Sequence, residues 1–424
     1  MNYSVTQSSR RLLFYTLFLA YICAGIISIL PGPTLPLLAK HTSVPLAIAG
    51  WAFTSSATGF VLGAFIAGIV GSRSNAKYAL MAGLGIMACA GIVTSWTHSF
   101  PLLLGAQFIM GLGFGCLDVS VNVIVSLSFK DTLGETLNNL HSSYGIGALL
   151  APLFLSLVLQ LTHDAIGAFA AGSLVGFIVI FLLIRQQIPT VAKQNKAGQQ
   201  QNISAPLSVF RQSLLWLMAL QLCLYVGAEV GFSNWIVTAV SQSAVISLVL
   251  AAPAATAFWL GLTIGRLLGA QLLKRGILSE TQLLYISVLG GCISGLVLAA
   301  FVGQIGVSFA FSALIGLFFG PIYPGITAIA LRWFVNALST VSAVMLISAG
   351  LAGMILPVLM GFLILPIGIN WVMAIPALVC LSIAIPLSIT LRQQRHILHL
   401  RSAQHTMEQE TILPIIPQRK EKRG

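Results

Sequence analysis

Twelve long apolar runs, separated by short polar breaks, constrain this chain more than any other feature of its sequence. A helix needs about 20 apolar residues to cross a bilayer, and each run is of that order. The predicted spans are 12–38, 46–71, 77–97, 100–128, 137–161, 165–185, 213–239, 248–273, 280–302, 306–331, 338–365 and 368–390. Only 7% of the residues are charged, whereas a soluble protein has roughly a quarter. We therefore predict an all-α, multi-pass membrane protein covered mainly by lipid.

One long polar break divides the predicted spans six and six. It is rich in Gln and contains several basic residues, a composition typical of a flexible linker. We expect an N-terminal six-helix bundle at 1–185, a linker at 186–212, a C-terminal six-helix bundle at 213–390 and a basic tail at 391–424.

The distribution of basic residues predicts the orientation. If the N-terminus is cytoplasmic, the linker, the tail and the basic loops all lie inside and Lys40 is left outside, as the positive-inside rule requires. The net charge of +12 follows from this asymmetry, so anionic lipid headgroups are the expected partner and nucleic acid is not. We expect a monomer in a bacterial inner membrane with a cytoplasmic linker and both termini in the cytoplasm.

The two halves repeat each other in register. The sequence GLGFG at 111–115 matches GLFFG at 316–320, an offset of 205 residues. The same offset brings the Ser, Gly and Pro positions of 143–152 onto those of 348–357. Because many transporters are built from duplicated helix sets, this repeat favours two related six-helix units.

Two carboxylates are the main functional candidates. Ionisable groups inside hydrocarbon are costly and usually functional, and Asp118 and Glu229 are the acids deep in predicted spans. Asn122 follows Asp118 by one helical turn and shares its face. A buried carboxylate without a basic partner is readily protonated, and we expect no intramembrane Lys or Arg beside Asp118. We predict both acids as proton-coupling residues, with Na⁺ as the alternative ion and a structural hydrogen bond as the alternative role of Asp118.

The seventh span carries a polar stripe. Gln221, Tyr225 and Glu229 recur every four residues, so they share a face that should point into the bundle. Glycines on both sides of Glu229 predict local unwinding of this helix. Amide, phenol and indole groups suit a polyhydroxylated solute, which makes Gln221, Tyr225, Asn234 and Trp235 predicted substrate contacts. Anchoring at the lipid interface is the alternative for Trp235.

The fifth span begins with the polar sequence NNLHSSYG at 138–145. Asn138 and His141 lie three residues apart and share a face that can meet the face of Asp118. Histidine titrates near neutrality, so His141 is a second candidate for proton transfer or substrate binding, together with Asn138. A structural histidine at a helix start is the alternative.

The arrangement of twelve spans in two halves resembles the major facilitator superfamily over essentially the whole chain. The usual loop motif of that superfamily after the second span is G-x-x-x-D-R-x-G-R-K, and residues 68–77 read GIVGSRSNAK. Arg73 and Lys77 fit this motif, whereas Ser72 stands in place of the acid. The resemblance implies that Arg73 and Lys77 belong to a conformational loop and that the two bundles rock to give alternating access.

A narrower resemblance lies in the fourth, fifth and seventh spans. Residues 117–122, LDVSVN, are similar to the L-E-x-x-x-N of the fucose permease type of sugar/proton symporter. The resemblance implies that Asp118 is the protonated carboxylate and Asn122 a substrate contact. The first span has no acid where that symporter has one, which leaves Glu229 as the candidate replacement.

We therefore predict secondary active uptake of a sugar or similar small polar metabolite, driven by protons. A proton-driven exporter of drug-like amphiphiles is the alternative. GALLAP at 147–152 partly matches a Gly-Pro antiporter motif, but Ala151 replaces its Gly, and Gln107 stands where many antiporters have Arg. No catalytic set, metal cluster or nucleotide motif is recognisable, so neither an enzyme nor a cofactor is expected. A non-transporting sensor is the remote third reading.

Overall fold

The computed structural model describes residues 7–71, 76–129, 132–164, 166–186, 207–334 and 337–394. Within these ranges the regular structure is helical and contains no strand. Twelve helices are long and apolar enough to cross a membrane. The predicted twelve-span, all-α fold is therefore confirmed.

The first six spans are built from eight helices. They are α1 (Gln7–Ile29), α2 (Pro31–His41), α3 (Leu46–Ala49), α4 (Trp51–Gly71), α5 (Ala76–Trp96), α6 (Phe100–Ser128), α7 (Leu133–Thr162) and α8 (Gly167–Ile184). Short α2 connects the first two spans, and α3 opens the second. Helix α7 ends at His163, whose positive φ of 57° places it in the left-handed conformation that commonly stops a helix.

The second half follows a short 3-10 turn, η2 (Leu207–Arg211). Its helices are α9 (Ser213–Ser243), α10 (Leu248–Ala251), α11 (Pro253–Lys274), α12 (Glu280–Phe301), α13 (Ile305–Phe319), α14 (Ile322–Trp333), α15 (Leu338–Val372) and α16 (Ala374–Ser382), with helix continuing over 384–394. The tenth span is divided into α13 and α14 at Pro321, which has no N–H to continue the helical hydrogen bonds.

The predicted unwinding of the seventh span is wrong. Helix α9 runs without interruption past the glycines that flank Glu229. A Cβ atom at Gly231 would lie 2.9 Å from Sδ of Met360, and one at Gly227 would lie 3.5 Å from a methyl of Leu356. Both glycines therefore allow α15 to pack closely against α9, which explains their presence in a regular helix.

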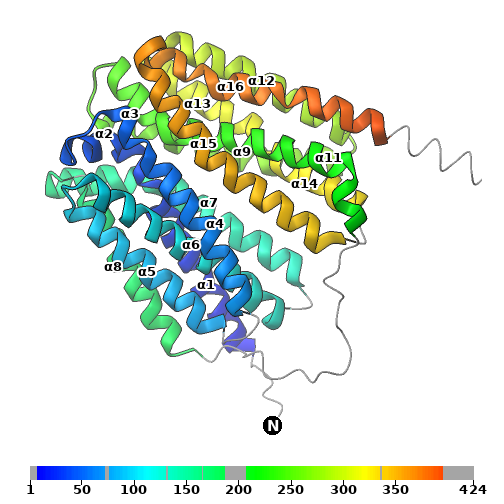
Figure 1. The fold of residues 1–424 in the computed structure, drawn as a ribbon, viewed down its shortest axis with the longest axis horizontal. Coiled ribbons are helices and arrows are strands. Elements are labelled where there is room, and N and C mark those ends of the chain that lie inside the picture. Colours follow the sequence, from blue (N-terminus) through cyan, green and yellow to red (C-terminus); the bar gives the residue numbers. More distant parts are fainter. Residues whose placement is uncertain are drawn as a thin grey trace, which may run out of the picture.

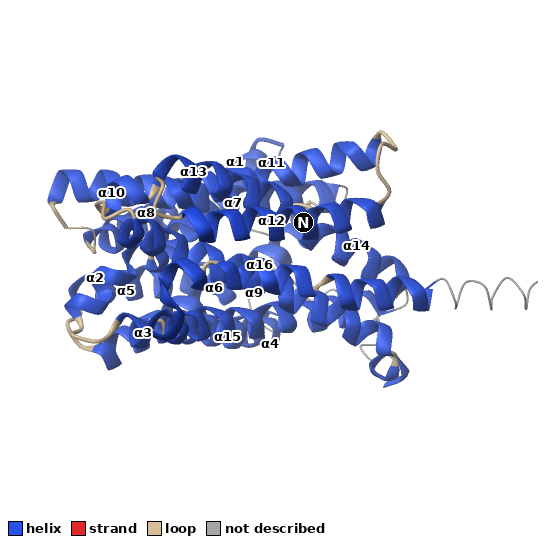
Figure 2. Ribbon diagram, turned by 90° about the horizontal axis from the view of Figure 1, so that it is seen from above, coloured by secondary structure: helices blue, strands red, loops and turns tan. Residues whose placement is uncertain are grey.

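Two hydrophobic clusters divide the molecule. One consists of residues between 13 and 183, and the other consists mainly of residues between 209 and 387. Figure 1 shows the helices α1–α8 gathered on one side and α9–α16 on the other, and Figure 2 shows the same helices turned by 90°. The polypeptide therefore packs as two groups of helices with separate cores.

The internal repeat of the sequence is also a repeat of contacts. Gly59 and Gly63 of α4 lie against backbone carbonyls of α6, and Gly261 and Gly265 of α11 lie against backbone carbonyls of α13. The two glycine pairs are 202 residues apart, and the carbonyls that they touch are 205 residues apart. In each half, one equivalent pair of helices thus packs through direct backbone contact.

The halves meet near the end of the molecule opposite the start of α1 and the last described residues (Figure 1). Phe53 of α4 packs edge-on against Trp235 of α9, with ring centroids 6.2 Å apart. The Thr54 hydroxyl donates to the Met354 carbonyl, and the Thr256 hydroxyl donates to the Leu149 carbonyl at 3.2 Å. These hydrogen bonds and the Phe53–Trp235 contact join the bundles along α4 with α9 and α15, and along α7 with α11.

Candidate substrate and proton site

Asp118 forms a polar cluster with residues of α1 and α7. The Tyr21 hydroxyl donates to Oδ1 of Asp118 at 2.8 Å, and Tyr21 is 1% exposed. His141 interacts electrostatically with Asp118, and its ring lies 5.5 Å from the Tyr21 ring. Asn122 donates its amide to the Asp118 backbone carbonyl at 2.9 Å. The structure thus brings Asp118, Asn122 and His141 together, and Tyr21 fixes the carboxylate.

Glu229 has a cation beside it. Arg266 of α11 interacts electrostatically with Glu229, and the Tyr225 hydroxyl lies near both charged groups. In the described residues, the Tyr225 hydroxyl and Nε of Arg266 are buried without a hydrogen-bond partner of standard geometry. Glu229, Tyr225 and Arg266 therefore form a polar cluster in the C-terminal half.

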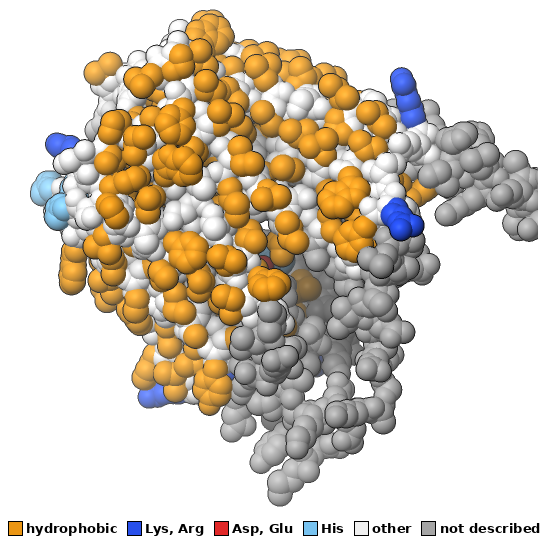
Figure 3. Space-filling model, viewed as in Figure 1, with side chains coloured by type: hydrophobic (Ala, Val, Ile, Leu, Met, Phe, Trp, Pro, Cys, Tyr) orange, Lys and Arg blue, Asp and Glu red, His pale blue; other side chains and the backbone are white. Residues whose placement is uncertain are grey.

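The two acidic clusters face one region between the halves, here called the central region, which is bordered by Asp118, Glu229, Tyr144 and Tyr323. Tyr144 of α7 is in electrostatic range of both Asp118 and Glu229, and Tyr323 of α14 is in range of the same two acids. Asp118, Glu229, Tyr144 and Tyr323 are all partly exposed rather than buried. In Figure 3 the apolar face is hollowed where the two bundles part, and an acidic side chain is visible in the hollow.

Aromatic rings line the region next to Asp118. Phe114, one turn before Asp118 on α6, stacks on Tyr144 with centroids 5.3 Å apart and an interplanar angle of 16°. Phe60 of α4 adds a third ring at 5.3 Å from Phe114. The Tyr144 hydroxyl is held at 3.0 Å from the Ser28 hydroxyl. Flat aromatic faces beside hydrogen-bonding groups are a common feature of small-molecule sites.

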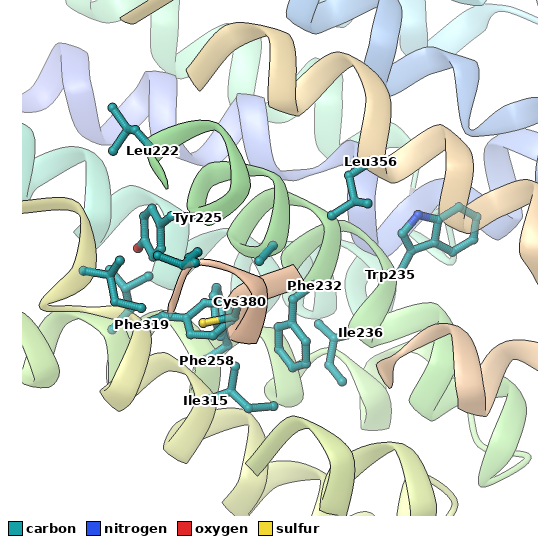
Figure 4. Packing of buried hydrophobic residues seen from close by; sticks show 14 of the residues in the cluster. Leu222, Tyr225, Phe232, Trp235, Ile236, Phe258, Ile315, Phe319, Leu356 and Cys380 are labelled. Atoms are coloured by element: carbon teal, nitrogen blue, oxygen red, sulfur yellow. The ribbon is translucent and has the colours of Figure 1, made fainter. Parts of the chain in front are cut away.

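Three of the predicted contacts on α9 are buried. Gln221 is 1% exposed and donates to the Thr390 hydroxyl at 2.9 Å, so its amide joins α9 to the last span. Tyr225 and Trp235 are 0% exposed, and Figure 4 shows them in the packed interior. Trp235 donates to the Pro357 carbonyl at 2.9 Å. Trp235 therefore packs between helices at the junction of the two halves, and lipid-interface anchoring is wrong for it.

The remaining predicted residues are dispersed. Asn234 is partly exposed and lies against Gly32 in α2, at the junction of the halves. Lys77 donates to the Ile184 carbonyl at 2.9 Å and so caps the end of α8. Arg73 lies outside the described residues. Asn138 lies in α7, three residues before His141, and it is His141 that reaches the Asp118 cluster.

Comparison with known proteins identifies the family. The sequence profile of the Major Facilitator Superfamily matches residues 17–308. The chain belongs to the Major Facilitator Superfamily. It is therefore a membrane transporter rather than an enzyme, as its composition and spans predicted.

Several curated proteins are similar in sequence. Sodium-dependent glucose transporter 1 of Xenopus laevis is 25% identical over 299 residues, which cover 64% of this chain and 59% of that protein. Bypass of stop codon protein 6 of Saccharomyces cerevisiae is 24% identical over 382 residues, or 80% of this chain and 74% of that protein. The chain thus spans less than two thirds of the first of these relatives.

Two solved structures share the fold. The fucose:proton symporter of E. coli aligns over 90% of this chain and 99% of its own, with 21% identity and a TM-score of 0.61. A bacterial homologue of the human lysosomal transporter Spinster, in an inward-facing and occupied conformation, aligns over 91% of this chain and 98% of its own, with 13% identity and a TM-score of 0.74.

Arg266 is the main residue that sequence reasoning missed. It lies eight residues before Lys274 at the end of α11, about 12 Å along the helix axis. Because α11 ends in the basic residue Lys274, a count of basic residues assigns Arg266 to the cytoplasmic side together with it. The signal available in the sequence was a lone arginine inside the small and apolar stretch GLTIGRLLGA at 261–270. The expectation of no intramembrane Lys or Arg concerned Asp118 alone, and the sequence predicted no basic neighbour for Glu229, whereas the structure places Arg266 in electrostatic range of it.

Proposed function

We propose that this transporter carries out proton-coupled uptake of a sugar or similar small polar metabolite by alternating access. Asp118 and Glu229 would carry the coupling protons, one in each half. The central region between them would bind the solute, with Asn122 and His141 as hydrogen-bonding groups and the rings of Phe114 and Tyr144 against an apolar sugar face. Rocking of the two bundles would expose this region to each side in turn.

The observation that carries the proposal is the convergence of the two intramembrane acids. Asp118 and Glu229 come from different halves, yet Tyr144 and Tyr323 are each in electrostatic range of both. A charge at this depth costs a few kcal/mol or more, so the residues that carry one there are usually functional. Because both carboxylates border one region, their protonation can be tied to the solute that occupies it and to the movement of the halves.

The substrate class and the ion draw on similar proteins. Sodium-dependent glucose transporter 1 and the fucose:proton symporter are both named for a sugar, and they are named for different ions. A carboxylate can bind either a proton or Na⁺. We place the proton first because the Tyr21 hydroxyl already donates to one oxygen of Asp118, and this carboxylate has no Lys or Arg among the described groups that act on it.

The test is solute accumulation in proteoliposomes with purified full-length protein. With an imposed pH gradient, inside alkaline, labelled sugar should accumulate above its external concentration. The Asp118→Asn variant keeps the size and polarity of the side chain but cannot release a proton. We expect this variant to lose gradient-driven accumulation while retaining exchange of labelled for unlabelled sugar.

Asp164→Asn is the matched control. Asp164 lies in the loop before α8, where its carboxylate accepts a hydrogen bond from the Ile166 amide at 2.9 Å, and it is exposed. Its loss should leave accumulation unchanged. Accumulation driven by Na⁺ without a response to pH would overturn proton coupling but keep uptake. Extrusion of hydrophobic dyes without sugar uptake would instead support the exporter.

A further inference from the structure

Arg266 is an intramembrane cation without a direct ion pair. The one salt bridge among the described residues joins Arg332 and Glu280, at the exposed end of α14 and α12. Arg266 interacts with Glu229 only at longer range, and its Nε is buried without a hydrogen-bond partner. Arg266 is nevertheless partly exposed, as Glu229 is. Tyr225 lies within hydrogen-bonding reach of the Arg266 side chain, but Nε is left as a donor inside the membrane that the fold does not use.

The charges around Arg266 form a simple balance. Tyr225 on α9 and Tyr323 on α14 are each in electrostatic range of both Glu229 and Arg266. Tyr144 of α7 is in range of Glu229 from the other half. All three tyrosines are neutral near pH 7. With Glu229 ionised, its charge compensates that of Arg266. When Glu229 binds a proton, the guanidinium is left without a counter-charge, which is unfavourable at this depth.

An anion can replace Glu229 as the counter-charge. Guanidinium binds carboxylates through two parallel N–H donors, a geometry that a hydroxyl group does not match. Binding of a carboxylate at Arg266 would therefore be favoured when Glu229 is protonated and opposed when it is ionised. One proton and one anion would then enter together, because each makes the other's binding favourable.

We infer that the solute carries an anionic group, such as the carboxylate of a sugar acid, and that Arg266 binds it while Glu229 carries the coupling proton. This inference rests on the proposed function and names the substrate class of its site. Glu229 thus has the role of a proton-controlled counter-ion, and Asp118 remains the coupling acid of the other half.

The experiment compares D-glucuronate with D-glucose in proteoliposomes of the full-length protein under an inward proton gradient. We expect the initial rate for glucuronate to exceed that for glucose by about tenfold or more, because an unpaired buried charge strongly disfavours the neutral sugar. Arg266→Gln should reduce glucuronate uptake by a similar factor, and Arg266→Lys should retain part of it. Arg332→Gln, which removes an exposed arginine of the same half, should have no effect.

Glu229→Gln provides a readout that a misfolded protein would not give. This variant keeps Arg266 without its counter-ion, so it should exchange glucuronate across the membrane but fail to accumulate it from a pH gradient. Uptake of glucose without transport of glucuronate, and without inhibition by it, would overturn the inference and leave the proposed function intact. Accumulation of neither compound would contradict both. Equal transport of both by the wild type and by Arg266→Gln would also overturn the inference.

Discussion

At the residue scale, the direction in which a polar side chain points decides its role. Gln221, Tyr225 and Glu229 form one stripe in the sequence, yet only Glu229 is partly exposed. The Gln221 amide donates a hydrogen bond to the Thr390 hydroxyl, and the Trp235 indole N–H donates one to the Pro357 carbonyl. Residues that fill and bridge the helix interfaces are thereby separated from residues that a solute can reach.

Gln221 provides a test of this separation. Gln221→Leu removes the buried hydrogen bond to Thr390 and should lower the free energy of unfolding by about 1 kcal/mol. The KM for the transported solute should not change, since the side chain does not border the central region. Thermal stability in detergent and uptake kinetics measure the two effects. A raised KM with unchanged stability would restore Gln221 as a substrate contact.

At the element scale, glycines set how closely the helices pack. Gly316 of α13 lies against the Phe258 carbonyl of α11, and Gly111 of α6 lies against the Ser56 carbonyl of α4. Small residues at such contacts let helix backbones approach within the bilayer, where the hydrophobic effect does not hold helices together. The same device thus serves the equivalent helix pair in each half.

Two glycines of α13 should respond differently to alanine. At Gly316 a Cβ atom would collide with backbone of α11, whereas at Gly306 it would meet nothing within 4 Å. We expect Gly316→Ala to destabilise the protein by about 1–3 kcal/mol and Gly306→Ala to leave it unchanged or slightly more stable. The melting temperatures of the two variants measure this difference, and equal values would contradict the packing role of Gly316.

At the scale of the whole molecule, α4 and α15 join the halves toward the end opposite the start of α1 (Figure 1). Gly353 of α15 lies against Ala57 of α4, and a Cβ atom at Gly353 would be 3.7 Å from that of Ala57. Alternating access requires these helices to separate during each cycle. The contact is thus one that transport must break and remake.

A cysteine pair at Ala57 and Gly353 should lock the transporter. The Cβ separation of 3.7 Å matches the value of about 3.8 Å in disulfides. In a background without the six native cysteines, oxidation should stop uptake and reduction should restore it, while either single cysteine should be insensitive. Electrophoresis after cleavage in the linker would verify the bond. Full uptake by the cross-linked protein would show that α4 and α15 do not separate at Ala57 and Gly353 during transport.

Hydropathy and repetition determined the fold from the sequence alone. Each span is a local property, because twenty apolar residues must form a helix to satisfy their backbone in lipid. The offset of 205 residues likewise showed two related halves before any contact was known. The positive-inside rule still predicts that both termini are cytoplasmic. Charge scarcity also singled out Asp118 and Glu229, which the structure places around one region.

Only the tertiary structure decided what surrounds each acid. Tyr21 lies 97 positions from Asp118 in the chain, and Arg266 and Glu229 belong to different helices. Periodicity specifies which residues share a face of one helix, but not which face of another helix meets it, since that depends on small-residue contacts and side-chain fit between distant segments. For this reason the two carboxylates could be predicted from the sequence. Only the structure showed that Tyr21 donates a hydrogen bond to Asp118 and that the charge of Arg266 acts on Glu229.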